Sequence, residues 1–176
     1  MKELSLNILD IVKNSVKAGA TKIEITVAIS TSDDRLEIVI ADNGCGMSKE
    51  FLARVRDPFT TTRTTRKAGL GIPFFEAAAL QSGGDFDIES EEGVGTVVRA
   101  GFGYTNIDRA PLGNMSETME VLISGSPEIR FLYNYIIDGK EFNFDTDEIK
   151  KQLGDIPLST PEVLSWIGEY IEEGTK

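Results

Sequence analysis

The stretch IADNGCGM, residues 40–47, ends an apolar run and then places glycine at alternate positions. Five of the six residues from Leu36 to Ala41 are apolar, which predicts a strand that runs into Asp42. A carboxylate there can accept a hydrogen bond from the amino group of a flat ring. Gly44 and Gly46 then leave bare backbone for the ring, or let the chain turn with positive φ. An ordinary turn would give the same pattern, because Asn-Gly is a common turn signal.

Composition narrows the class of protein. The 176 residues suffice for one domain with room for an appended subdomain. A formal net charge of −11 argues against general binding of nucleic acid or anionic membranes. A single cysteine allows no internal disulfide, and neither an apolar run of membrane-spanning length nor a basic-then-apolar leader is found, so we expect a cytoplasmic protein. The absence of histidine excludes histidine acid–base catalysis, histidine-ligated metals and a phosphohistidine on these residues.

An acid-free segment follows the opening stretch. Residues 58–75, PFTTTRTTRKAGLGIPFF, hold Arg63, Arg66 and Lys67 but neither Asp nor Glu. A cationic segment in an anionic protein is a candidate anion site, although a solvated loop would look the same. Gly69 and Gly71 lead from it into a predicted helix, whose free N–H groups could cradle a polyphosphate. A plain glycine hinge is the alternative.

An amphipathic helix is predicted before the opening stretch, over residues 2–20. Its apolar positions Leu4, Ile8, Ile11, Val12 and Val16 recur at helical spacing. Asp10 and Asn14 lie one turn apart on the polar side. An Asn side-chain oxygen suits magnesium, and an Asp one turn away could orient or deprotonate a water. A solvent-facing polar stripe is the alternative.

The rest of the chain alternates predicted strands and helices. Residues 21–30 and 35–41 are expected to form an antiparallel hairpin, and Ser48 to cap a short helix over 48–57. From Thr105 onward the sequence predicts a helix, a hairpin around Asp138-Gly139 and two further helices. Asp145 and Glu148 have capping-box spacing, and Thr160 is placed to cap the last helix, which should bury Val163, Leu164, Ile167 and Ile171. We therefore divide the chain into residues 1–104 and a C-terminal extension, 105–176.

Five segments in order resemble the boxes of the GHKL superfamily, the ATP-binding fold of sensor histidine kinases, type II DNA topoisomerases, MutL proteins and ninety-kilodalton heat-shock chaperones. They are LDIVKNSVKAGA (9–20), ADNGCGM (41–47), DPFTTTR (57–63), KAGLGI (67–72) and GVGTVV (93–98). The first two look like the MutL branch, whereas the lid segment, GLGI and Lys17 look like kinases. The resemblance covers residues 1–103. It implies a two-layer α/β sandwich, the Bergerat fold, with helices on one side of a mixed, mostly antiparallel sheet and a small C-terminal α+β extension.

The resemblance also implies roles at matched positions. Asn14 would coordinate the Mg²⁺ that bridges the phosphates of ATP, and Asp10 is a tentative catalytic residue, one methylene shorter than the Glu of the hydrolysing branches. Asp42 would bind the adenine amino group, with Gly44 and Gly46 making room. Lys17, Met47 and Thr96 would also bind the nucleotide. Phe59 and Arg63 would do so from the ATP lid, and Gly69, Leu70 and Gly71 through their backbone.

Because these residues contain no histidine, a histidine phosphoacceptor would have to lie on another protein, and we consider three functional hypotheses. The first is an ATP-binding kinase module that transfers phosphate in trans, to histidine or Ser/Thr of a separate protein. The second is a non-catalytic or slowly hydrolysing nucleotide switch that controls a partner. The third is a regulatory sequestering protein, like the anti-sigma serine kinases of this fold. Residues 105–176 are expected to be a partner-docking subdomain, with a structural extension as the alternative.

Overall fold

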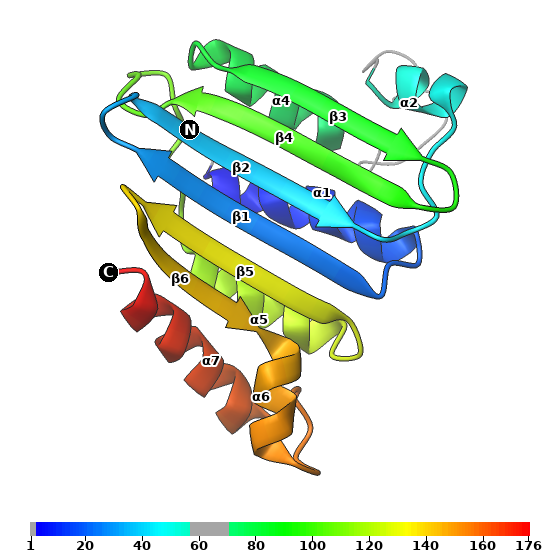
Figure 1. The fold of residues 1–176 in the computed structure, drawn as a ribbon, viewed down its shortest axis with the longest axis vertical. Helices are drawn as coiled ribbons and strands as arrows, with labels where there is room; N and C mark the ends of the chain where they lie inside the picture. The colour runs from blue at the N-terminus through cyan, green and yellow to red at the C-terminus, as the bar shows by residue number, and fades with distance from the viewer. Residues whose placement is uncertain (1–2, 57–70) are drawn as a thin grey trace.

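The computed structural model describes residues 3–56 and 71–176 and is built on one six-stranded sheet (Figure 1). The strand order is β3-β4-β2-β1-β5-β6. The strands are β1 (Lys22–Ser30), β2 (Arg35–Asp42), β3 (Asp85–Glu91), β4 (Gly95–Gly103), β5 (Arg130–Ile137) and β6 (Lys140–Asp145). Every neighbouring pair is antiparallel except β1 and β5, which are parallel. The predicted mixed, mostly antiparallel sheet is confirmed.

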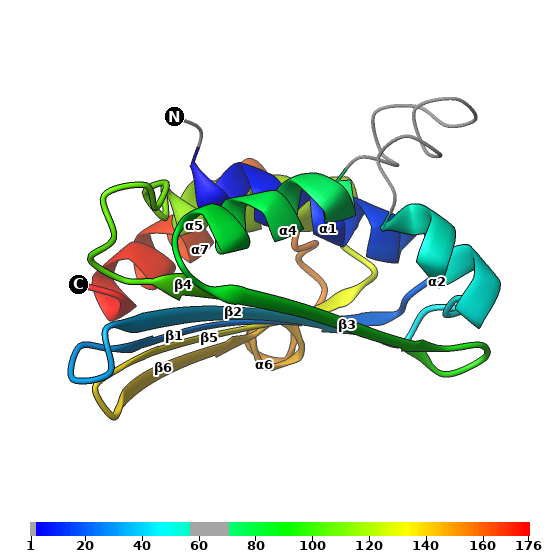
Figure 2. The ribbon, with the colours of Figure 1, turned by 90° about the horizontal axis from the view of Figure 1, so that it is seen from above.

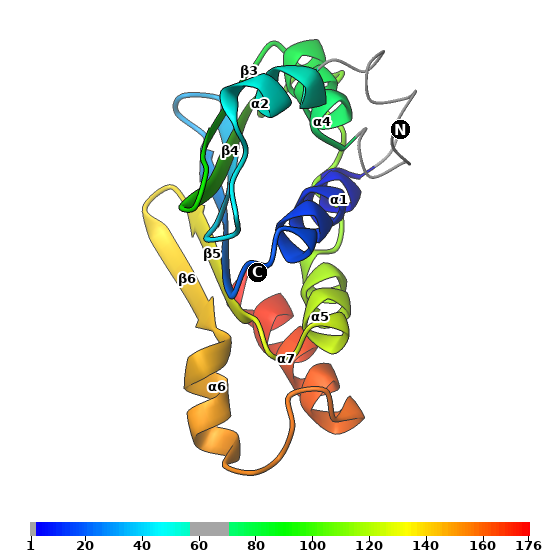
Figure 3. The same cartoon turned by 90° about the vertical axis from the view of Figure 1, so that its right-hand side faces the viewer.

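The described residues form six helices, and most of them make up the second layer (Figure 2). They are α1 (Leu4–Lys17), α2 (Lys49–Val55), α4 (Gly71–Gln81), α5 (Met115–Gly125), α6 (Thr146–Leu153) and α7 (Pro161–Gly174). Figures 2 and 3 show α1, α4, α5 and α7 together over one face of the sheet, whereas α6 lies apart from them beyond the end of β6. The two-layer sandwich is thus confirmed. Within the described residues, none of the helices has both the length and the apolar character needed to cross a membrane.

The alternation of the central strands explains why the helical layer covers one face of the sheet. Ile23, Ile25 and Val27 of β1 are fully buried, and the residues between them are less so. Strand β2 pairs with β1 in the register Ile25↔Ile40, so its own buried residues point to the same side. One apolar face per strand is the pattern of an antiparallel sheet with one covered side.

Helix α1 covers this face, and most of the residues predicted to be buried are buried. Four of the five expected apolar positions, Leu4, Ile8, Ile11 and Val12, are buried. The fifth, Val16, is only partly buried, and Ser15 is buried instead. Ser15 follows Ile11 and Val12 by one turn, which places it on the covered side of the helix.

The capping predictions have mixed outcomes. Ser48 caps α2 as predicted, since its hydroxyl accepts a hydrogen bond from the N–H of Phe51. Asp145 caps α6 by accepting from the N–H of Asp147. Glu148 makes no return bond to Asp145 among the described residues and contacts Lys151 at 3.4 Å instead, so the reciprocal capping box is not formed.

Helix α7 begins where predicted but is not capped as predicted. Thr160 occupies the N-cap position, yet its hydroxyl donates to the carbonyl of Pro157 at 2.7 Å and makes no capping bond. Ile167 and Ile171 are buried as expected. Val163 and Leu164, which lie in the first turn of the helix, are only partly buried.

The C-terminal segment continues the same sheet and core. Strand β5 pairs with β1 from Lys22 to Ile29, and the predicted β5–β6 turn is confirmed, with positive φ at Asp138 and Gly139. Helix α5 adds Met119 and Ile123, both fully buried, to the core. The division at residue 104 stays a prediction, which a truncation can test.

Candidate functional site

The polar side of α1 meets the start of α4, which brings together two of the predicted boxes. Gly71, the first residue of α4, is buried. A Cβ placed on Gly71 would lie 3.5 Å from the Cβ of Asp10 and 3.8 Å from Nδ2 of Asn14. Asn14 is half-buried at this approach, whereas Asp10 and Lys17 are exposed. The structure thus joins the predicted metal ligand, the tentative catalytic carboxylate and the predicted phosphate-binding backbone at one place.

Asp42 lies at the end of β2 with both carboxylate oxygens held. Its Oδ2 accepts a hydrogen bond from Ser15 Oγ at 2.5 Å, and its Oδ1 accepts from the N–H of Gly44 at 2.8 Å. A carboxylate oxygen has two lone-pair sites, so each can still accept a further donor. The carboxylate is therefore oriented by the protein and retains the capacity to accept from an amino group.

The loop after Asp42 is fixed between α1 and the β3–β4 turn. The N–H of Cys45 donates to the carbonyl of Ala18 at 2.9 Å, and the N–H of Gly93 donates to the carbonyl of Cys45 at 2.7 Å. Gly46 has φ +72°, and a Cβ there would lie 2.0 Å from the carbonyl oxygen of Glu91. The protein's own backbone therefore requires glycine at position 46.

Gly44 is also closely packed by the protein itself. A Cβ there would lie 2.8 Å from the Cβ of Ala18. The structure supplies a packing reason for both glycines of this box, and their expected role in leaving room for the adenine ring stays a prediction.

Thr96 lies directly across from Asp42 in the β2–β4 register. Its hydroxyl is 2.7 Å from that of Ser90 on β3, and Ser90 Oγ also accepts from the N–H of Met47 at 2.8 Å. This network links three segments at one end of the sheet. It joins Met47 to Thr96, both predicted from the boxes, and Thr96 is the residue opposite Asp42.

Four predicted residues, Phe59, Arg63, Gly69 and Leu70, lie outside the described residues. The elements on either side of that segment are joined by an ion pair between Arg56, at the end of α2, and Glu76 of α4, at 2.7 Å. The Arg56 guanidinium also lies 5.6 Å from the ring centroid of Phe86. Helices α2 and α4 are thus held together beside the Asp42 loop.

Sequence reasoning missed two residues of this site. Ser15 orients Asp42, and the available signal was a serine at a helix position where the apolar period calls for a buried side chain. Ser90 joins Met47 to Thr96. No signal marked it, because an alternating strand reveals which face a residue occupies but not its partner across the sheet.

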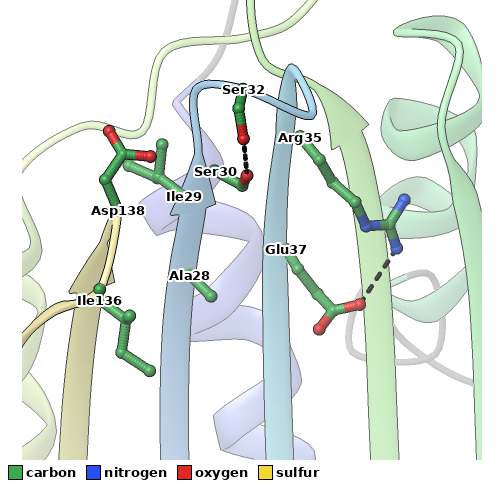
Figure 4. Close-up of a pocket in the computed structure, with 9 residues that line it drawn as sticks. Ala28, Ile29, Ser30, Ser32, Arg35, Glu37, Ile136 and Asp138 are labelled. Carbon is green, nitrogen blue, oxygen red and sulfur yellow. Dashed lines mark hydrogen bonds and ion pairs between the residues drawn. The ribbon is translucent and has the colours of Figure 1, made fainter.

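A separate hollow lies near the other end of β2, between the tips of the two hairpins (Figure 4). Arg35, which lines it, is seven residues from Asp42, or roughly 23 Å along a strand. Figure 4 shows Arg35 directed at Glu37, 3.0 Å away, and Ser30 at Ser32, 3.3 Å away. Because these groups pair with one another, we treat the hollow as part of the fold.

The residues present fit a nucleotide and magnesium by their chemistry. Asp42 offers a half-buried carboxylate that can accept a hydrogen bond, and the backbone of Gly71 lies next to Asn14. An amide oxygen suits magnesium, which takes few protein ligands and keeps waters. The described residues hold no group of three or more His, Cys, Asp or Glu side chains that could bind a metal. Asn14 as a magnesium ligand stays a prediction.

Comparisons with known proteins identify the family. Residues 2–105 match the family described as histidine kinase-, DNA gyrase B-, and HSP90-like ATPase. Histidine protein kinase DivJ of Caulobacter vibrioides is 37% identical over 95 residues, which cover 52% of this chain and 16% of DivJ. Sporulation kinase D of Bacillus subtilis is 33% identical over 91 residues, which cover 52% of this chain and 18% of that kinase.

A solved structure, the N-terminal domain of a DNA repair protein, matches with a TM-score of 0.52 and 15% identity over 81% of this chain and 52% of that chain. At this identity the likeness supports the fold alone. The chain spans less than a fifth of the length of the two kinases. It nevertheless belongs to the histidine kinase-, DNA gyrase B- and HSP90-like ATPase family, with an ATP-binding domain similar to the catalytic domains of histidine kinases.

Proposed function

We propose that this chain is a magnesium-dependent kinase module that transfers the γ-phosphoryl group of ATP to a separate protein. The observation that carries the proposal is the approach of Gly71 to Asp10 and Asn14, because it combines an exposed carboxylate, an amide and the first residue of a helix. Asn14 would hold the metal, which would supply charge neutralisation for the phosphates. Asp42 would select adenine at the other end of the nucleotide.

A groove beside Asp10 supports an acceptor in trans. It runs between α1 and α4 and includes Leu6, Asp10 and Phe74 in its lining. Leu6 and Phe74 are 46% and 55% exposed. Two apolar side chains next to an exposed carboxylate are suited to hold a partner segment while its acceptor atom reaches the site.

The chemistry balances with the residues named. The bond between the γ-phosphorus and the bridging oxygen breaks, a bond from the phosphorus to the acceptor nitrogen or oxygen forms, and ADP leaves. The acceptor's proton passes to Asp10 or to solvent. Because these 176 residues contain no histidine, a phosphohistidine would have to lie outside them.

The test is transfer of label from γ-phosphate-labelled ATP. The whole chain, ATP and Mg²⁺ are incubated with each purified protein encoded beside its gene, and the Asp42→Asn variant serves as the nucleotide-binding control. Acid-labile label on a partner indicates phosphohistidine, and acid-stable label indicates phosphoserine or phosphothreonine. If no partner is labelled but one binds only with ATP or ADP, the kinase proposal fails and the nucleotide switch or anti-sigma-type regulator replaces it.

A further inference from the structure

The outer side of α7 carries an ordered pair of exposed aromatic rings. Trp166 and Tyr170 lie one turn apart, with ring centroids 5.1 Å apart and planes within 10° of parallel. Their residues are 45% and 41% exposed. Tyr170 is held from behind by Phe142 of β6, at a centroid distance of 5.4 Å. Trp166 is therefore presented to solvent on a fixed support.

A shallow hollow adjoins the indole. Its lining consists of Pro161, Glu162, Ser165, Trp166 and Glu169, all from α7. Glu162 precedes Trp166 by four residues and Glu169 follows it by three, so both carboxylates share its side of the helix. Neither carboxylate forms an ion pair with any residue in the described part of the chain.

The residues that line this hollow and the rest of its helix carry negative charge. Helix α7 contains four glutamates and neither lysine nor arginine. On the neighbouring α5, burial raises the pKa of Glu120, and the negative charges of Glu117 and Glu169 raise it further. Such a surface repels anionic membranes, and it repels a second copy of itself, because each copy would bring the same glutamates.

We propose that this hollow binds an arginine- or lysine-bearing segment of a partner protein, with the cationic group over the Trp166 indole and between Glu162 and Glu169. A cation within about 6 Å of an indole face is attracted by the ring, and the two carboxylates add direct charge complementarity. The site lies outside residues 2–105 and uses none of the nucleotide-binding residues. It gives residues 105–176 a defined recognition role that does not depend on phosphate transfer.

The experiment uses Trp166 as its own reporter, because the chain has one tryptophan. The probe is an acetylated, alanine-based peptide of about 15 residues with arginines one turn apart. The full chain is titrated while tryptophan emission is followed. A saturable change is expected with the arginine peptide and not with the same peptide carrying glutamine in place of arginine.

Variants make the assignment specific. Glu162→Gln combined with Glu169→Gln should weaken peptide binding at least about tenfold. The control is Asp87→Asn combined with Glu89→Gln, which removes the same charge from two exposed residues of β3, at the opposite edge of the sheet. This control should change the affinity for the peptide less than about twofold. Trp166→Leu, followed by anisotropy of a labelled peptide, should also weaken binding. All three variants should keep the wild-type affinity for ATP, which separates this test from that of the kinase proposal.

Four outcomes overturn the proposal. They are equal binding of the arginine and glutamine peptides, wild-type affinity in the Glu162→Gln and Glu169→Gln variant, an emission change from concentration-dependent self-association without peptide, and tighter binding to vesicles of anionic lipid than to the arginine peptide. Each would show that the hollow does not select a cationic protein segment.

Discussion

The hydroxyl of Ser15 in α1 donates a 2.5 Å hydrogen bond to the carboxylate of Asp42 at the end of β2. Ser15 is buried, and the N–H of Gly44 holds the second oxygen of the same carboxylate. The helical layer thereby orients the group that is predicted to select adenine. A ligand meets a carboxylate whose position is already fixed, so little ordering free energy is lost on binding.

The Asp42→Asn variant should lose about 1.5–3 kcal/mol of ATP-binding free energy, or roughly 10- to 150-fold in affinity, because it loses a charge-assisted hydrogen bond. The fold should be retained, since the amide can accept from Gly44 N–H and donate to Ser15 Oγ. Calorimetry with ATP measures the loss, and Asp87→Asn on exposed β3 is the control. An unchanged affinity in Asp42→Asn would contradict the adenine assignment.

The Asn14→Ala variant should weaken ATP binding about tenfold in the presence of Mg²⁺ and less than about twofold in EDTA, because the lost group is a metal ligand. The matched control is Asn7→Ala, two turns earlier on the same helix. Both are measured by calorimetry with and without Mg²⁺. Equal losses under the two conditions would mean that Asn14 does not bind the metal.

Two glycine variants separate backbone strain from close packing. Gly46 and Gly93 both have positive φ, but a Cβ on Gly46 would lie 2.0 Å from the Glu91 carbonyl oxygen, whereas nothing lies within 4 Å of a Cβ on Gly93. Gly93→Ala should cost about 1–2 kcal/mol of unfolding free energy from strain alone. Gly46→Ala should cost at least about 2 kcal/mol more. Urea unfolding measures both, and equal losses would show that the Asp42 loop does not pack against Glu91 in solution.

Much of the sheet could be predicted because its strands carry strong local patterns. Ile23, Ile25 and Val27 alternate with polar residues, and the paired strand repeats the pattern. Strand order is different: the parallel pairing of β5 with β1 depends on contacts more than a hundred residues apart, and no local pattern encodes it. The sequence therefore predicted the hairpins but not that the C-terminal one joins the same sheet.

The sequence names candidate site residues where a motif specifies backbone and side chain together, as at Asp42 and Gly71, and their roles stay predictions. The site was not predictable where a partner is chosen by tertiary packing, as for Ser15 and Ser90. The capping prediction for Thr160 failed for a similar reason, because the sequence does not show which partner a side chain selects. Thr160 has a competing acceptor in Pro157, and a hydroxyl at a helix start can satisfy either partner.

Acid should weaken the ion pair between Arg130, at the start of β5, and Asp145, which caps α6. Arg130 donates two hydrogen bonds to Asp145, at 2.7 and 3.1 Å, and this pair holds the pKa of Asp145 below its ordinary value. A depressed pKa in the folded state stabilises the protein above the ordinary carboxylate pKa of about 3.9, and that stability is lost as the pH falls through the lower folded pKa.

The Arg130→Gln variant should therefore lose less unfolding free energy between about pH 5 and pH 3 than the wild type does. The difference should be small, because the Arg130 side chain is 38% exposed and solvent screens the pair. Urea unfolding across this pH range measures the difference, with Arg99→Gln, an exposed residue of β4, as the control. A wild-type acid slope in Arg130→Gln would show that the pair contributes nothing.

Deleting residues 115–176 tests the predicted division of the chain. The deletion removes β5, which pairs with β1 over Lys22 to Ile29, and it removes Met119 and Ile123 from the core. Exposing the ladder of a central strand and opening the core should abolish cooperative thermal unfolding, because each large buried side chain contributes about 2–5 kcal/mol. Far-ultraviolet circular dichroism and calorimetry with ATP check this. A truncated chain that melts cooperatively and binds ATP within about threefold of the wild type would instead establish residues 115–176 as a separable docking module.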